Sequence, residues 1–198
     1  NNSLAPLASL ANSGAELVRR GQTERLPQIL QTIGERTRHL ETFILGYARF
    51  AKLPSPRIEP CSWDGFIAQL ANQVRFKLTG ELPAEPAWFD PAQMEQALLN
   101  LLKNAHESGS PPDHVELNIR SAPGALRIEV ADRGTGMNDA VLTNALVPFY
   151  STKRSGTGLG LALAREIAEA HGGRITLGNR DGGGLNVTLI IPNAPAVH

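Results

Sequence analysis

The apolar residues of the first fifty positions recur every three or four residues, which is the period of an amphipathic helix. One apolar stripe runs from Leu4 to Val18 and a second runs from Leu26 to Tyr47. A polar break at residues 20–23 separates the two stripes. The pattern therefore predicts a helical hairpin, with helices over residues 3–20 and 24–51.

Two amphipathic helices by themselves cannot bury both apolar stripes. A four-helix bundle assembled from two copies of the hairpin would bury them, and packing of the hairpin against the rest of its own chain is the alternative. We expect the homodimer.

Thr23 is the expected N-cap of the second helix, because its hydroxyl can accept a hydrogen bond from a free backbone N–H.

From about residue 57 onward, helical and strand patterns are mixed. Pro54 and Pro56 end the second helix, because two prolines in three residues cannot continue it. The expected helices cover 62–74, 91–108 and 159–171, and the expected strands cover 75–79, 87–89, 115–121, 126–131, 174–177 and 185–191. This order lacks strict βαβ alternation, so we expect an α+β fold, with an α/β sandwich around a mixed sheet following the hairpin.

The expected domain limits follow from these patterns. They are a helical hairpin over residues 1–53, a linker over 54–60, a second domain over 61–193 and a tail over 194–198.

Composition excludes several classes of protein. The chain has 198 residues with 19 basic and 19 acidic side chains, so it lacks the charge typical of a nucleic-acid binder. Cys61 is the single cysteine, which excludes a disulfide framework and a cysteine zinc cluster and fits a reducing, cytoplasmic location. No apolar run approaches about 18 residues, so we expect no direct membrane contact. The chain begins at Asn1 without Met, and we expect a fragment whose parent can be anchored upstream.

Two asparagines stand on one face of the helix expected after residue 91. Asn100 and Asn104 are four residues apart, and residues with this spacing are neighbours on a helix surface. Their amide oxygens can ligate Mg²⁺ or accept hydrogen bonds from its waters. Taken alone, the pair is more simply interpreted as two polar surface residues.

Two glycine-containing segments are candidates for ligand binding. Asp132 and the glycines at 134 and 136 directly follow an expected strand. Such a carboxylate can accept a hydrogen bond from an exocyclic amine such as that of adenine, and the glycines let backbone approach a flat ring; an ordinary turn is the alternative.

The second segment, residues 156–160, leads straight into a helix, whose free N–H groups can bind phosphate. It is neither a Walker loop nor a dinucleotide fingerprint. Just before it, residues 148–153 combine two aromatic side chains with Lys153.

The order of these four segments resembles the catalytic domain of sensor histidine kinases, within the wider ATPase superfamily of gyrase, Hsp90 and MutL. The resemblance covers about residues 60–192. Residues 100–107 resemble the family's N box, 132–136 its G1 box, 149–153 its F box and 156–160 its G2 box. The form of residues 148–153 resembles the nitrogen-regulation branch most closely.

The resemblance implies a Bergerat-type ATP-binding fold that uses ATP and Mg²⁺ to phosphorylate a protein histidine. The partner would be a response-regulator receiver domain, whose aspartate accepts the phosphoryl group. By the same resemblance, Asn104 holds Mg²⁺ with help from Asn100, both counted as catalytic, and Asp132 selects adenine. The implied ATP-binding residues are Asn100, Lys103, Asn104, Asp132, Gly134, Gly136, Lys153, Thr157, Gly158, Leu159 and Gly160.

The resemblance extends to the hairpin. Residues 2–7 resemble the segment just after the phosphoacceptor histidine of this family, and alignment of Asn2 and Pro6 with the pattern His-Glu-x-x-Asn-x-x-x-Pro puts that histidine before Asn1. His39 lies outside the resembling segment, so we do not expect it to be the acceptor.

Two alternative functions stay open at this stage. They are a serine-directed protein kinase with the same ATP fold, and a nucleotide-binding scaffold that signals through dimerisation. Hydrolytic relatives carry a glutamate at the place of Asn100, as base for water. An amide cannot act as that base, which favours transfer to a histidine over hydrolysis.

Overall fold

The computed structural model describes residues 4–51, 53–153 and 156–193. The chain forms two compact units, Asn1–Lys52 and Leu53–His198. Asn2 and the expected tail lie outside the described residues, as does the side chain of His39. None of the helices in the described ranges is both long and apolar enough to cross a membrane.

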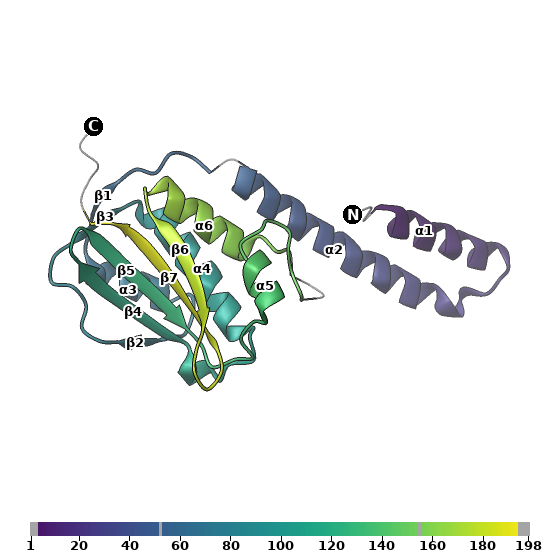
Figure 1. Ribbon diagram of the computed structural model, residues 1–198. Helices are drawn as coiled ribbons and strands as arrows, with labels where there is room; N and C mark the ends of the chain where they lie inside the picture. The colour runs from purple at the N-terminus through teal and green to yellow at the C-terminus, as the bar shows by residue number, and fades with distance from the viewer. Residues whose placement is uncertain (1–3, 52, 154–155, 194–198) are drawn as a thin grey trace. The chain divides into compact units, whose positions relative to one another are not determined.

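The first unit is the predicted helical hairpin (Figure 1). Helix α1 (Leu4–Arg19) and helix α2 (Leu26–Ala51) are joined through the 3-10 turn η1 (Thr23–Arg25). The two helices pack closely near Gly14, where an added Cβ would lie 3.7 Å from the side chains of Leu26 and Ile29.

The predicted role of Thr23 is wrong. Thr23 opens η1 instead of capping α2, and Gln22, the residue before η1, makes no side-chain capping bond. The physical reason is that η1 runs directly into α2, so the chain is already helical at the residue before Leu26.

The second unit contains the predicted mixed sheet. Its five strands are β2 (Lys77–Thr79), β4 (Glu116–Ala122), β5 (Ala125–Ala131), β6 (Arg174–Asn179) and β7 (Leu185–Pro192). They lie in the order β2-β4-β5-β7-β6. The β2–β4 pair is parallel and the other pairs are antiparallel. Alternate strand residues, such as Ile119, Ile128 and Leu189, are buried, so one face of the sheet forms the core.

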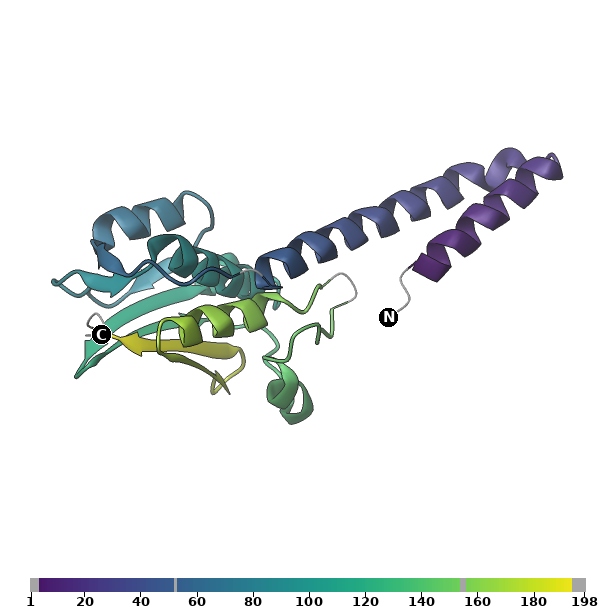
Figure 2. The same ribbon diagram turned by 90° about the horizontal axis from the view of Figure 1, so that it is seen from above.

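Two helices pack side by side on that face, α4 (Pro91–His106) and α6 (Gly160–Ala170) (Figures 1 and 2). Helix α3 (Trp63–Ala71) packs beside α4 near a small sheet of β1 (Glu59–Cys61) and β3 (Ala87–Phe89). The sequence patterns missed β1, the 3-10 turn η2 (Pro112–His114) and helix α5 (Asp139–Asn144), which are all short. Since β1 begins at Glu59, the last two residues of the expected linker belong to a strand.

Asp90 is the N-cap of helix α4, which carries the asparagine pair, and both of its carboxylate oxygens accept hydrogen bonds. The Asp90 Oδ1 atom accepts a hydrogen bond from the backbone N–H of Gln93 at 3.0 Å. Its Oδ2 atom accepts from the backbone N–H of Arg57 at 2.9 Å, and the Gln93 side chain donates to the Pro54 carbonyl at 2.9 Å. The same residues that start α4 therefore hold the incoming segment 54–57.

A buried histidine links this cap to the end of α6. The Nε2 atom of His171 accepts from the backbone N–H of Asp90 at 3.0 Å, and Nδ1 donates to the Ile167 carbonyl at 2.7 Å. Burial lowers the pKa of the His171 imidazole, against smaller raising effects of the Ile167 bond and the Asp90 charge. A neutral ring can accept at Nε2, so α4 and α6 are fixed to one another at the end of the pair opposite the site described next.

Candidate functional site

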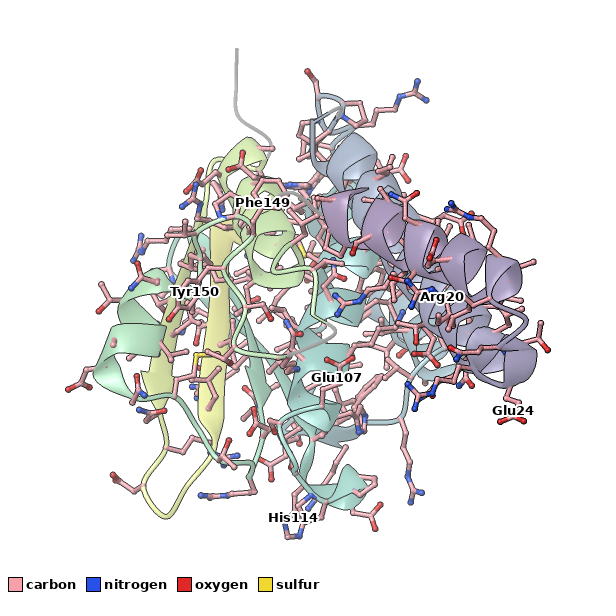
Figure 3. All side chains as sticks on the ribbon, turned by 90° about the vertical axis from the view of Figure 1, so that its right-hand side faces the viewer. Arg20, Glu24, Glu107, His114, Phe149 and Tyr150 are labelled. Carbon is pink, nitrogen blue, oxygen red and sulfur yellow. The ribbon has the colours of Figure 1, made fainter. Side chains whose placement is uncertain are left out.

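A cavity of about 650 Å³ lies between the C-terminal half of α4, the segment after β5 and the segment between α5 and α6. Its volume is typical of sites for small-molecule ligands. Its walls bring together residues from all four predicted segments, which are Asn104, Asp132, Gly136, Lys153, Thr157, Gly158 and Gly160. In Figure 3, Glu107 is labelled at the end of α4 and Tyr150 in the segment that follows α5.

Four of the predicted site residues do not line the cavity. Leu159 is 4% exposed and belongs to the core. Lys103 is exposed, while Asn100 lies one turn before Asn104, within 4 Å of the place where a Cβ on Gly160 would be. Gly134 packs against Ser108.

The carboxylate of Asp132 is buried and has one oxygen fully engaged by the protein. Its Oδ1 atom accepts from the backbone N–H groups of Gly134 at 2.8 Å and Leu185 at 3.3 Å, and the Ser108 hydroxyl lies 3.1 Å away. Among the described residues, no group donates to Oδ2. One oxygen therefore fixes the side chain, and the other can accept a hydrogen bond from a ligand in the cavity.

The two glycines after Asp132 are required by protein contacts. A Cβ on Gly134 would lie 2.0 Å from the Ser108 hydroxyl oxygen. Gly136 has a φ of +67°, and its Cβ would lie 2.8 Å from the Asn179 Oδ1 atom. Both glycines thus let the loop backbone approach other parts of the protein, and Gly136 also lines the cavity.

The glycine-rich loop before α6 crosses the backbone of Phe149 and Tyr150, in the segment between α5 and α6. Gly158 has a φ of +68°, and a Cβ there would lie 2.6 Å from the carbonyl carbon of Phe149. The backbone N–H of Phe149 donates to the Gly158 carbonyl at 3.0 Å. Only glycine fits this crossing, so the loop is fixed where it enters α6.

The N-terminus of α6, the positive end of its helix dipole, faces the cavity. Helix α6 has 11 residues, and Leu159 at its N-cap provides no side-chain capping bond. Thr157, Gly158 and Gly160 line the cavity at this end. Free N–H groups and the positive end of the helix dipole favour an anion here.

Asn104 is half-buried in the opposite wall of the cavity. Its Nδ2 atom would be 3.3 Å from a Cβ on Gly160, so the amide faces the start of α6. The described ranges contain no cluster of three or more His, Cys, Asp or Glu side chains able to hold a metal. A divalent cation beside Asn104 would therefore rely on the amide oxygen and on oxygens of the ligand and water, a donor set that suits Mg²⁺.

An ion pair joins the segment between α5 and α6 to the end of α4 at the cavity wall. The Lys153 ammonium lies 2.7 Å from a Glu107 carboxylate oxygen, and both side chains line the cavity. They are 40% and 60% exposed, so the pair adds little stability. Lys153 can therefore exchange this carboxylate for another anion at small cost.

Several residues that line or support the cavity were not singled out from the sequence. Ser108 and Leu185 hold Asp132, Asn179 contacts the loop after it, and Val130, Val141 and Val187 lie in the cavity wall. For Ser108, its place just after the asparagine helix was a usable signal. Asn179 had no local signal, because it ends a strand and contacts residues far away in the sequence.

Comparison with known proteins agrees with this geometry. Residues 89–195 match the family model described as "Histidine kinase-, DNA gyrase B-, and HSP90-like ATPase". The C4-dicarboxylate transport sensor protein DctS of Rhodobacter capsulatus is 32% identical over 209 residues, which cover 97% of this chain and 32% of DctS. The chain thus spans about a third of the length of this curated relative.

Solved structures show the same fold. Full-length ShkA in complex with AMPPNP superposes with a TM-score of 0.69 at 24% identity, over 88% of this chain and 40% of that one. Histidine kinase ThkA in complex with response regulator protein TrrA gives a TM-score of 0.69 at 19% identity, over 98% and 61%. The chain therefore belongs to the histidine kinase-, DNA gyrase B- and HSP90-like ATPase family and carries a catalytic domain of the sensor histidine kinase type.

Proposed function

We propose that this chain is the kinase core of a two-component signalling protein of the cytoplasm. It uses Mg²⁺-ATP to phosphorylate a protein histidine that precedes Asn1, for relay to an aspartate of a response-regulator receiver domain. The observation that carries this proposal is one cavity that combines a buried carboxylate acceptor, an amide oxygen and a helix N-terminus. The ShkA complex with AMPPNP and the ThkA complex with its response regulator support the ligand and the partner.

Each end of the cavity suits one end of ATP. The free Oδ2 atom of Asp132 would accept a hydrogen bond from the adenine amine, and apolar side chains such as Val130 and Val187 would contact the ring. The N–H groups at the start of α6 would bind phosphate oxygens. Lys153 would leave Glu107 for the phosphates, which carry more negative charge.

The site would catalyse mainly by holding the reactants in place. Mg²⁺ bound with Asn104 would neutralise charge on the transferred phosphoryl group. Asn104 and the start of α6 would orient that group toward the acceptor. Asn100 carries an amide where a base would be needed to activate water, so the residues present favour transfer over hydrolysis. The sensor-protein relatives do not favour the serine-kinase and scaffold alternatives.

We propose a dimerisation hairpin over 1–53, a linker over 54–60 whose last two residues begin strand β1, and a catalytic domain over 61–193. Among the hairpin side chains that the structure describes, the large apolar residues Val18, Leu30 and Ile44 are 55%, 63% and 55% exposed. Apolar area of this kind is favourable to bury. A four-helix bundle formed with a second copy would bury it.

Leu30→Glu should shift the chain from dimer toward monomer, because a charge in the bundle core opposes its assembly. Sedimentation velocity at micromolar concentration measures this shift. Gln28→Glu is the matched control, since it adds the same charge at a polar, exposed position of the same helix. Monomeric wild-type protein at every concentration tested would contradict the bundle.

The proposed reaction predicts a specific label. A chain extended by its upstream residues, incubated with γ-labelled ATP and Mg²⁺, should acquire label that is lost in acid and retained in base, as phosphohistidine is. Replacement of the upstream histidine should abolish the label, whereas His39→Ala should not. Acid-stable label would instead indicate a serine-directed kinase.

Asp132→Asn should weaken ADP binding. The asparagine can keep its oxygen on the Gly134 and Leu185 N–H groups, which turns its NH₂ toward the adenine amine. Loss of a charge-assisted hydrogen bond costs about 1.5–3 kcal/mol, roughly a ten- to hundred-fold loss of affinity. Isothermal titration measures it, with the exposed Asp64→Asn as control. Equal affinities of wild type and variant would remove Asp132 from the site.

Asn104→Ala should reduce the gain in ATP affinity that Mg²⁺ provides, by roughly ten-fold if one bond to a charged group is lost. Titrations with ATP in Mg²⁺ and in EDTA give that gain for each protein. Asn72→Ala is the control, because Asn72 is exposed at the end of α3. The metal assignment fails if Mg²⁺ strengthens binding equally in all three proteins.

A further inference from the structure

We propose that Asn179 is a positioning residue that holds the loop 132–137 against the β6–β7 hairpin and thereby sets the preference of the cavity for adenine. This inference rests on the proposed function. The β6–β7 turn lies at the same end of the sheet as the segment that leaves β5 (Figure 1). Side-chain hydrogen bonds join these two segments at both ends of the loop.

The side-chain amide of Asn179 pairs with both backbone groups of one loop residue. Its Nδ2 atom donates to the Met137 carbonyl at 2.6 Å, and its Oδ1 atom accepts from the Met137 N–H at 2.9 Å. Met137 lies in a loop and has no strand partner. The amide therefore supplies the two hydrogen bonds that a neighbouring strand would otherwise give to this backbone.

The loop is shaped to meet this amide. Gly136, which precedes Met137, has a φ of +67°, a backbone conformation that favours glycine. A Cβ at Gly136 would lie 2.8 Å from the Asn179 Oδ1 atom. The left-handed turn and the missing side chain together allow the loop backbone to approach Asn179.

Other contacts fix the opposite end of the loop, at Asp132. The Arg180 guanidinium donates to the Asp132 carbonyl at 3.1 Å. The Arg133 guanidinium donates to the Asp181 carbonyl in the hairpin turn at 2.8 Å. Gly184 has a φ of +100°, and a Cβ there would lie 2.0 Å from the Asp132 carbonyl oxygen. Other residues of the β6–β7 hairpin therefore hold Asp132 independently of Asn179, and Asn179 holds the Met137 end of the loop.

Asn179 positions the loop but does not itself line the cavity. Asp132, Gly136 and Met137 line the cavity, whereas Asn179 does not. Loss of the Asn179 amide would free Met137 while Asp132 keeps its own hydrogen bonds. The wall that faces a ring bound at Asp132 would then move, so the ring would be held less well relative to the Oδ2 atom. Adenine, whose amine donates to Oδ2, would therefore lose more affinity than a ring that carries a carbonyl oxygen in place of the amine.

The first test needs no nucleotide. Amide hydrogen exchange of the full chain should be faster at Met137 in Asn179→Ala than in wild type, because its N–H has lost its acceptor. Asn179→Asp keeps an acceptor for that N–H but places a carboxylate near the Met137 carbonyl, so it should lie between the two. Asn186→Ala is the matched control, since Asn186 is on β7 and its Oδ1 atom has no hydrogen-bond partner. Unchanged exchange at Met137 in both Asn179 variants would overturn the proposal.

The second test measures selectivity. ADP and inosine diphosphate, which has a carbonyl oxygen in place of the adenine amine, are titrated into each protein. In Asn179→Ala the affinity for ADP should fall by about ten-fold, because binding must then order a loop that two neutral hydrogen bonds hold in place in the wild type, and the ADP preference should shrink. Asn186→Ala should keep the wild-type preference. Equal losses for both nucleotides would show a merely structural role and overturn the proposal.

The two tests also separate this proposal from the proposed function. Wild-type protein that binds neither nucleotide, or both equally, would contradict the adenine site and the selectivity role of Asn179 together. Wild-type preference for ADP that persists unchanged in Asn179→Ala would leave the proposed function intact and overturn the role of Asn179 alone.

Discussion

A buried carboxylate must be hydrogen bonded, because a charge removed from water without partners is costly. In this chain that requirement joins three parts of the catalytic unit at Asp132. Its Oδ1 atom contacts Ser108 from the end of α4, Gly134 from its own loop and Leu185 from the start of β7. The Oδ1 atom thus contacts the helix layer, the loop and the sheet, and the Oδ2 atom can accept a hydrogen bond from a ligand in the cavity.

The cavity exists because α4 and α6 are held side by side on one face of the sheet without closing over its end. At one end of the pair, His171 accepts from the N–H of Asp90, the residue that caps α4. At the other end, the absence of a side chain at Gly160 lets the start of α6 approach Asn104. The amide and the helix N-terminus therefore face a common space, as binding of a charged, metal-bound phosphate requires.

Much of the fold could be predicted because it depends on local patterns. The apolar period of the first fifty residues predicts the hairpin, and Asp90 followed by Pro91 predicts the start of α4. The elements that were missed are β1, η2 and α5, which are three to six residues long. Such short segments have too few residues to show a period, and they form because the surrounding structure pairs or packs them.

The sequence by itself determined the chemistry and the order of the four segments, since a carboxylate, two amides and a glycine-rich helix start are local features. Only the tertiary structure decided which residues meet. It placed Lys103 and Asn100 outside the cavity wall and turned Gly134 toward Ser108. It also brought Asn179 to Met137 and Leu185 to Asp132, which are 42 and 53 residues apart in sequence. Contacts across such separations depend on strand order and register, and no local pattern of side chains specifies either.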